Sequence, residues 1–320
     1  MVWVWASFLL LIIICLALDL GVFNKKDHVI GPREATKWTS IWVGLALAFS
    51  GVIWWLYSSG IVTNPTNLKP SDAVIDYLTG YLVELSLSID NVFVIAIIFS
   101  SFQIPAKYQH RVLFWGILGA IVFRAVMIVF GVTLINRFDW IIYVFGAFLL
   151  YTAYTMLKDE KKTDPKDSWT YKQVSKVLPL TSEIRGHAFF IKQDNKEYAT
   201  PLFIALIIIE LTDVMFALDS IPAILAITQD EFIVFSSNIL AILGLRSMFF
   251  LIVGMLSKFH LINYSLAVIL GFVGIKMLLV EYLHIPSWLS LAIIGFALAG
   301  GIFASLNIKP KNEDEGINTG

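Results

Sequence analysis

Acidic residues inside apolar segments are the first feature of this sequence that could do chemistry. Segment 206–227 is apolar enough to lie in a membrane, yet it contains Glu210, Asp213 and Asp219. A carboxylate near the centre of a bilayer is costly unless it is paired, protonated or in contact with water, so three in one helix indicate a functional site. Pro222 follows closely and is expected to break this helix. Inside a membrane a broken helix is tolerated where it lines a cavity or is buried in protein.

The acidic pattern occurs twice. Residues 84–98 read ELSLSIDNVFVIAII, and residues 213–227 read DVMFALDSIPAILAI. In both segments two acids stand six positions apart, and the second acid precedes a residue with a neutral side-chain oxygen. The matched pairs are Glu84 with Asp213, Asp90 with Asp219 and Asn91 with Ser220. Further downstream the matched pairs are Arg124 with Arg246 and Tyr143 with Tyr264. The sequence therefore contains a duplicated unit.

The candidate metal ligands in these segments all offer oxygen. They are Glu84, Asp90, Asn91, Glu210, Asp213, Asp219 and Ser220. Oxygen-only sites suit hard cations such as Mg²⁺, Ca²⁺ and Mn²⁺, and they argue against Zn²⁺ or Cu⁺. On an unbroken helix, Glu84 and Asp90 would lie roughly 120° apart, too far round the helix for one ion to touch both. We therefore expect breaks near 86–90 and 217–222, which would let the acids converge.

Internal ion pairing is the alternative to a cation site. The candidate charge-balancing residues are Asp19, Arg124, Arg246 and Lys276. Asp19 and the five acids above face only these three bases, which leaves a surplus of three negative charges. A divalent cation plus a proton, or several protons, would balance that surplus, and we favour a cation or proton site over purely structural pairing. Asp19 lies near its helix end and could reach water, whereas the arginines are best explained as structural counter-charges.

Composition predicts an all-α polytopic membrane protein. Of 320 residues, 58% are hydrophobic and 15% charged, whereas about 25% of a soluble domain is charged. The net charge of −1 argues against a nucleic-acid partner. The single cysteine, Cys15, excludes an intramolecular disulfide and a thiolate metal cluster. The first apolar segment lacks the basic start of a signal peptide, so we expect it to remain as a helix.

Nine apolar segments are long enough to span a bilayer. They lie at 2–23, 38–57, 77–102, 111–134, 139–157, 201–227, 232–256, 263–283 and 286–306. With the N-terminus outside, 18 lysines and arginines fall in inner segments and 2 in outer segments. This asymmetry predicts nine transmembrane helices, an external N-terminus and a cytoplasmic C-terminus. The glycines 116, 119, 271 and 274 are expected to allow close packing of these helices.

The domain organisation follows from the duplication. Within a transmembrane domain at 1–306, repeat one covers 72–157 and repeat two covers 201–283. Each repeat has three helices, so the second copy enters from the opposite side, as in the inverted repeats of transporters. That symmetry brings the two acidic helices together at the middle of the membrane. Segment 158–200 is predicted to be a long cytoplasmic loop with a small hairpin, and 307–320 a disordered cytoplasmic tail.

These motifs resemble the TerC family of integral membrane proteins, which is named for tellurium resistance and includes manganese exporters. The resemblance covers nearly the whole chain and is strongest to its long, Alx-type branch. The matching segments are 84–98, 124–130, 138–152, 198–202 and 210–224, with ILGLRSMFF and VGIKML further on. The resemblance implies a protein of the bacterial inner membrane that exports Mn²⁺ from the cytoplasm, with the acidic motifs as the metal path. It implies no permanently bound cofactor.

Two residues depart from the family pattern. Leu85 and Thr155 stand where the family usually carries lysine. Both replacements remove positive charge beside the predicted site. We therefore expect the acids here to depend more on protons for their neutralisation, and export to depend on pH.

The leading hypothesis is a secondary exporter of divalent metal ions that works by alternating access, with H⁺ exchanged at one carboxylate. The motif GxxxxGK[ST] is absent from the sequence, so ATP is not the expected energy source. An intramembrane aspartyl enzyme is a weaker alternative, because the Tyr-Asp and Gly-x-Gly-Asp settings of such enzymes are absent around Asp90 and Asp219. A third hypothesis is an accessory factor for membrane-protein assembly or for metalation of secreted proteins. Its docking surface for a protein partner would be the loop 158–200.

Overall fold

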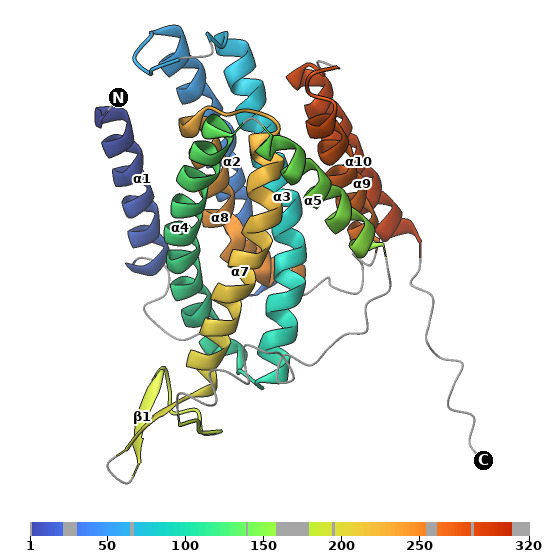
Figure 1. Ribbon diagram of the computed structural model, residues 1–320. Coiled ribbons are helices and arrows are strands. Elements are labelled where there is room, and N and C mark those ends of the chain that lie inside the picture. Colours follow the sequence, from blue (N-terminus) through green and yellow to red (C-terminus); the bar gives the residue numbers. More distant parts are fainter. Residues whose placement is uncertain are drawn as a thin grey trace, which may run out of the picture.

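The computed structural model describes residues 2–21, 31–64, 67–138, 140–157, 179–193, 196–253, 261–282 and 285–308 (Figure 1). The helices are α1 (Val2–Gly21), α2 (Pro32–Ser58), α3 (Pro70–Ser101), α4 (Ala106–Arg137), α5 (Ile141–Met156), α7 (Pro201–Leu225), α8 (Glu231–Val253), α9 (Ile262–Leu278) and α10 (Ser287–Asn307). Each apolar segment identified in the sequence overlaps one of these helices. The all-α architecture is confirmed, while the number of helices that cross the membrane stays a prediction.

The loop between α5 and α7 contains the expected hairpin. Strands β1 (Phe190–Gln193) and β2 (Lys196–Ala199) pair antiparallel, with Phe190 opposite Ala199. The first part of this loop, 158–178, and most of the predicted tail, 309–320, lie outside the described residues.

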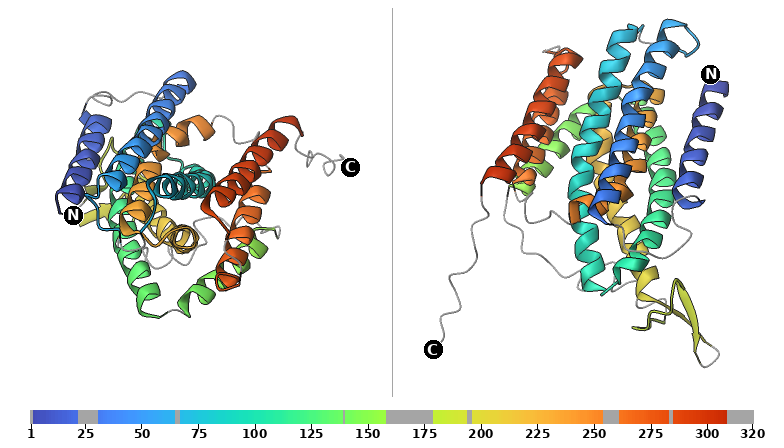
Figure 2. Two further views of the ribbon diagram at one scale, coloured as in Figure 1. Left: turned by 90° about the horizontal axis from the view of Figure 1, so that it is seen from above. Right: turned by 180° about the vertical axis from the view of Figure 1, so that it is seen from behind.

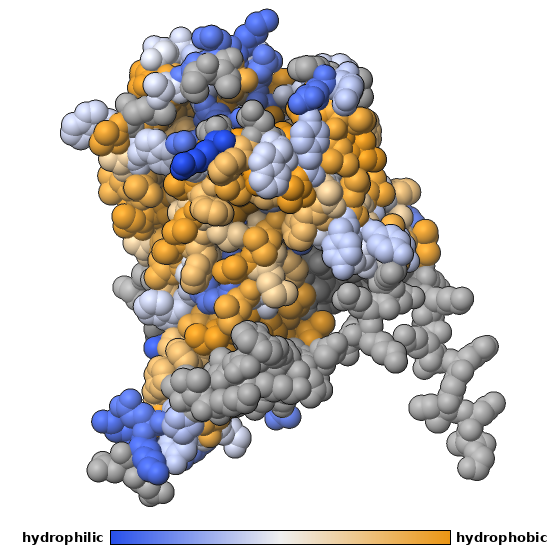
Figure 3. Space-filling model, in the orientation of Figure 1, coloured by the Kyte–Doolittle hydropathy of each residue, from blue (hydrophilic) through white to orange (hydrophobic). Residues whose placement is uncertain are grey.

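The surface of the helix bundle is apolar around its middle. Figure 3 shows a broad hydrophobic band on one face, with hydrophilic groups gathered towards the two ends. Five helices in the described part of the chain, α2, α4, α7, α8 and α10, are long and apolar enough to cross a membrane. Large apolar side chains such as Trp3, Phe130 and Phe296 are exposed. A soluble protein would not expose so extended an apolar surface, whereas lipid covers it at no cost.

Helix α3 is the central element of the bundle. It contacts α2, α7, α8 and α10, and the view from above shows it enclosed by other helices (Figure 2). Helices α5, α9 and α10 form one side of the molecule, where α9 packs against both of the others. Asp76 and Glu84 of α3 are therefore placed in the interior, away from lipid.

The contacts between helices follow a symmetric pattern. A two-fold relation between α3–α5 and α7–α9 pairs α3 with α7, α4 with α8 and α5 with α9, and all three pairs are in contact. The reciprocal pairs α3–α8 and α4–α7 are also both in contact. Helices α3 and α7 run in opposite directions (Figure 1). This pattern is what an inverted repeat requires, although the division into repeats 72–157 and 201–283 stays a prediction.

Helices α5 and α9 approach each other closely at two glycines. A Cβ atom on Gly274 would lie 2.9 Å from the carbonyl oxygen of Gly146, and one on Gly146 would lie 3.1 Å from the carbonyl oxygen of Gly274. Only glycine at both positions allows this backbone contact without a shift of the helices. Gly274 therefore has the packing role expected for it.

The orientation in the membrane can be tested with a reporter at the C-terminus. Helices α1 and α10 run in the same direction, and the β1–β2 hairpin lies at the end of the bundle towards which both run (Figure 1). Because positive charge gathers on the segments at this end, we expect it to face the cytoplasm. A C-terminal reporter should be active in the cytoplasm and inactive outside. The opposite result would overturn both the helix count and the inverted-repeat assignment.

Candidate functional site

Arg124 of α4 joins the two acidic helices. Its Nη2 and Nε atoms donate to the two carboxylate oxygens of Asp213 in α7, at 2.9 and 3.2 Å. Its Nη1 atom forms a close ion pair with Oε1 of Glu84 in α3. Arg124 is 1% exposed and Glu84 0% exposed. Charges this deeply buried persist only when paired and hydrogen-bonded, and the two parallel bonds to Asp213 are the strongest form of such a pair.

Neutral side chains complete this arrangement. Asn238 of α8 donates its Nδ2 hydrogen to Oε2 of Glu84 at 2.8 Å. The hydroxyl oxygen of Ser220 accepts a hydrogen bond from Nη1 of Arg124 at 3.3 Å. We call these five residues the central network: Glu84, Arg124, Asp213, Ser220 and Asn238. Four helices supply its members, so it forms only when α3, α4, α7 and α8 are packed together.

The expected helix breaks are wrong. Helix α3 is continuous through residues 86–90, and α7 is continuous through 217–222 with Pro222 inside it. Pro222 lies in the last turn of α7, where the loss of one backbone hydrogen bond disturbs few residues. The acids converge because two antiparallel helices face each other across Arg124, so Glu84 meets Asp213 and no helix has to unwind.

Glu210 occupies a space left by a glycine. Its carboxylate lies against Gly119 of α4, so that a Cβ atom added at Gly119 would collide with the carboxylate oxygens. Its Oε2 atom is buried and has no hydrogen-bond partner among the described residues. The expectation that Gly119 serves close helix packing is therefore corrected, because it makes room for an acid. A buried carboxylate oxygen without a donor is unfavourable, and it marks a place that a proton or a cation would satisfy.

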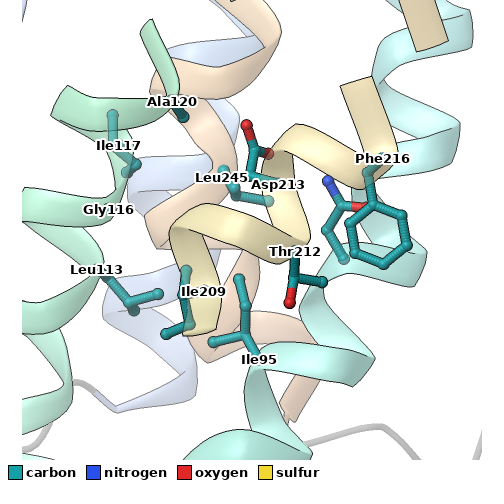
Figure 4. A pocket seen from close by; sticks show the side chains of 11 residues that line it. Ile95, Leu113, Gly116, Ile117, Ala120, Ile209, Thr212, Asp213, Phe216 and Leu245 are labelled. Atoms are coloured by element: carbon teal, nitrogen blue, oxygen red, sulfur yellow. The ribbon is translucent and has the colours of Figure 1, made fainter. Parts of the chain in front are cut away.

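The other predicted ligands on these helices are also placed. Oδ1 of Asp219 accepts a hydrogen bond from the Thr152 hydroxyl of α5 at 2.9 Å, and Thr155 in turn donates to the Thr152 carbonyl at 2.8 Å. Oδ1 of Asn91 is buried without a partner in the described part of the chain. Asn91 and Asp213 line a cavity of about 20 Å³ between α3, α4 and α7, whose walls are otherwise mainly apolar (Figure 4). This volume is close to what one water molecule needs.

Some predicted site residues are not brought together. The side chains of Asp19 and Asp90 lie outside the described residues. Arg246 is buried in α8, and Lys276 of α9 donates to Ser290 of α10 at 3.1 Å, apart from the central network. Among the described residues no group of three or more His, Cys, Asp or Glu side chains is arranged as a metal site. The metal site stays a prediction, since two of the carboxylates that a metal ion would need, those of Glu84 and Asp213, are paired with Arg124.

Three polar residues inside the helices were not identified from the sequence. Asn238 and Thr152 bond directly to predicted ligands, and Asp76 lies one residue before the predicted start of its helix at 77. Each is a polar side chain inside an apolar helix, which is the signal that could have found them. Helix α3 starts at Pro70, so Asp76 is within it, and it is 3% exposed.

Comparison with known proteins agrees with this architecture. Residues 69–313 match the family described as "Integral membrane protein TerC family". The "Uncharacterized membrane protein STKORF319" of Myxococcus xanthus is 46% identical, over 94% of this chain and 91% of its own. The "Putative membrane-bound redox modulator Alx" of Escherichia coli (strain K12) is 44% identical, over 91% of this chain and 90% of its own. No solved structure matches. The chain belongs to the TerC family of integral membrane proteins.

Proposed function

We propose that this protein is a secondary transporter that exports divalent metal ions, with Mn²⁺ as its cargo, across the bacterial inner membrane. The observation that supports this most is the central network. Two carboxylates from two matching helices meet inside the apolar band, and a single guanidinium group is shared between them. Because this site already holds the guanidinium cation of Arg124 between two carboxylates, it contains the kind of oxygen ligands that a metal cation needs.

The balance between acidic and basic side chains inside the membrane favours a cation as the ligand. Beyond the first turn of α3, the acids of α3 and α7 whose side chains are described are Asp76, Glu84, Glu210, Asp213 and Asp219, and all five are buried or half-buried. Against these five stand the bases Arg124, Arg246 and Lys276, which leaves two negative charges. One divalent ion or two protons would neutralise them. Unbalanced charge inside the membrane is costly, so the site should hold either the divalent ion or the two protons at any time. Exchange of one for the other would then accompany transport.

In this proposal, Arg124 competes with the metal ion for the carboxylates of Glu84 and Asp213. Glu84 is held by one guanidinium nitrogen and by the neutral Asn238, whereas Asp213 is held by two guanidinium nitrogens. Glu84 is thus the acid that can leave Arg124 with the smaller loss of bonds. Once released, it offers oxygen to the ion together with the side-chain oxygens of Asn238 and Ser220. Oxygen donors favour Mn²⁺ over soft ions such as Cu⁺.

The name of the Escherichia coli relative includes a redox role. This sequence contains one cysteine, Cys15, which is buried in α1. A dithiol–disulfide couple needs two cysteines, so such a couple cannot form within this sequence. Metal export is therefore the function that its residues support best.

The accessory role remains the alternative, with the described part of the 158–200 loop as its docking surface. There, Arg185 pairs with Glu183 through Nε and Nη2 at 2.7 and 3.0 Å, and the guanidinium keeps the pKa of Glu183 below its usual range. Gln193 of β1 donates to the same carboxylate at 2.6 Å. In this alternative, the exposed segment would bind another protein. An accessory factor would move no metal by itself, so transport by the purified protein separates the two functions.

Transport should be lost when the second acid of either motif becomes an amide. We expect Asp90→Asn and Asp219→Asn each to lower Mn²⁺ flux at least about tenfold, because each removes a charge that the ion must replace. Purified protein in liposomes containing a Mn²⁺-sensitive dye gives the rate. Asp72→Asn, a partly exposed acid near the start of α3, is the matched control and should transport normally. Wild-type rates in either motif variant would refute the proposal.

A further inference from the structure

A second group of polar side chains is buried at the end of the bundle where α3 begins. It consists of Tyr57, Asp76, Thr228, Asp230, Lys276 and Ser287, and we call it the terminal cluster. Four of these residues are buried, although two of the four are carboxylic acids. Asp76 precedes Glu84 by eight residues, which corresponds to about 12 Å along a helix. The terminal cluster is therefore separate from the central network, although α3 connects them.

Asp76 is a buried acid of this cluster with one unsatisfied oxygen. Its carboxylate faces the hydroxyl groups of Thr228 and Ser287 and the ammonium group of Lys276. Its Oδ1 atom is nevertheless buried and without a hydrogen-bond partner among the described residues. Lys276 gives its hydrogen bond to Ser290 and forms no close ion pair with Asp76. A buried acid with an open oxygen, close to a cation that bonds elsewhere, has room for a ligand.

Asp230 and Tyr57 add further oxygen atoms. Oδ1 of Asp230 accepts hydrogen bonds from the backbone of Phe232 and Ile233 at 3.0 and 3.1 Å, which caps helix α8. The Tyr57 hydroxyl lies near both Asp230 and Asp76. That hydroxyl is buried and makes no hydrogen bond within the described part of the chain. The cluster thus contains two acids and one ammonium group, and both Oδ1 of Asp76 and the Tyr57 hydroxyl are left without a hydrogen-bond partner among the described residues.

The terminal cluster has no counterpart in the other repeat. In the register that matches Glu84 with Asp213, Asp76 corresponds to Ala205. In the register that matches Tyr143 with Tyr264, Lys276 corresponds to Thr155. Both the acid and the base are therefore present in one half of the protein only. A general packing need of the repeat would call for them in both halves, so a role specific to one end of the bundle explains them better.

We propose that the terminal cluster is a second site for a divalent cation, bound by Asp76 and Asp230 with the hydroxyl groups of Thr228, Ser287 and Tyr57. Lys276 competes with the ion for these oxygens. A hard cation such as Mn²⁺ suits this donor set. Only the identity of the ion as Mn²⁺ cargo rests on the proposed function. If the N-terminus is external as predicted, the exported ion reaches this site last.

The test is direct binding of Mn²⁺ to purified full-length protein, measured from the electron paramagnetic resonance signal of free Mn²⁺. A Glu84→Gln background weakens the central network, and we expect this variant still to bind Mn²⁺. Adding Asp76→Asn should weaken the remaining binding at least about tenfold. Adding Asp72→Asn, which removes the same charge one turn earlier on α3, should leave it unchanged. Adding Lys276→Gln should strengthen binding, a gain that misfolding would not produce.

Other outcomes overturn the proposal. These are no binding in the Glu84→Gln background, equal binding with and without Asp76→Asn, or weaker binding after Lys276→Gln. The proposed transport function fails by a separate measurement, which is the absence of Mn²⁺ flux through wild-type protein in liposomes. Loss of flux with Asp76-dependent binding intact would refute the transport function alone. Normal flux without that binding would refute the terminal site alone.

Discussion

Replacing Arg124 with glutamine is expected to lower the free energy of unfolding by about 3–5 kcal/mol and to abolish Mn²⁺ transport. The substitution leaves Glu84 and Asp213 facing each other without their shared cation, and both are buried. Breaking one partner out of a buried ion pair is far more costly than removing an exposed charge. Unfolding of the purified protein in detergent, and flux in liposomes, measure the two effects. Arg137→Gln is the control, because Arg137 is exposed at the C-terminal end of the same helix.

A triple variant separates stability from function. When Arg124→Met is combined with Glu84→Gln and Asp213→Asn, the buried charges disappear together, so we expect most of the lost stability to return. Transport should not return, because the carboxylates that would hold the ion are gone. If Arg124→Gln alone unfolds like the wild type, the ion pairs do not support the fold. If the triple variant transports Mn²⁺, the central network is not part of the metal path.

Gly119→Ala is expected to abolish transport, whereas Gly116→Ala, one turn earlier on α4, should leave it nearly unchanged. A methyl group at Gly119 would collide with the Glu210 carboxylate. At Gly116 the added atom would lie 3.5 Å from Ile209, which is an ordinary contact. The atoms that would collide are the end of a flexible side chain, so we expect the Glu210 carboxylate to leave its position. Flux in liposomes, with the amount of folded protein measured alongside, gives the result.

A double-mutant cycle shows whether Glu210 is the cause. We expect Gly119→Ala to destabilise the protein in the presence of Glu210 and to have little effect in a Glu210→Ala background, where no carboxylate is left to collide. Additive effects of the two substitutions would mean that Gly119 acts on the backbone contact between α4 and α7 and not on the acid. Equal transport in the Gly119→Ala and Gly116→Ala variants would show that the position of Glu210 does not matter.

The sequence predicted the helices well because hydropathy and length are properties of each segment alone. It also placed Glu84, Asp213 and Ser220 on two helices that were expected to meet, since the duplication indicates which segments correspond. It did not reveal how they meet. The bond between Glu84 and Asn238 joins residues 154 positions apart, and no local pattern shows which faces of two distant helices come together. The expected helix breaks were wrong for the same reason. That expectation assumed that the two acids of one helix must converge, whereas the acids that come together belong to different helices, α3 and α7.

The contact between Gly146 and Gly274 has a mechanical consequence. At this point the backbones of α5 and α9 come into contact, and the side chains of Leu150, Met277 and Leu278 pack closely around the two glycines. Such a contact cannot slide along the helix axes without a collision, but it can pivot. If access to the acids alternates between the two sides of the membrane, we therefore expect α5 and α9 to rotate about this contact and not to slide past each other. The relative movement is left to the four helices that carry the central network, whose contacts are made by side chains and can be exchanged.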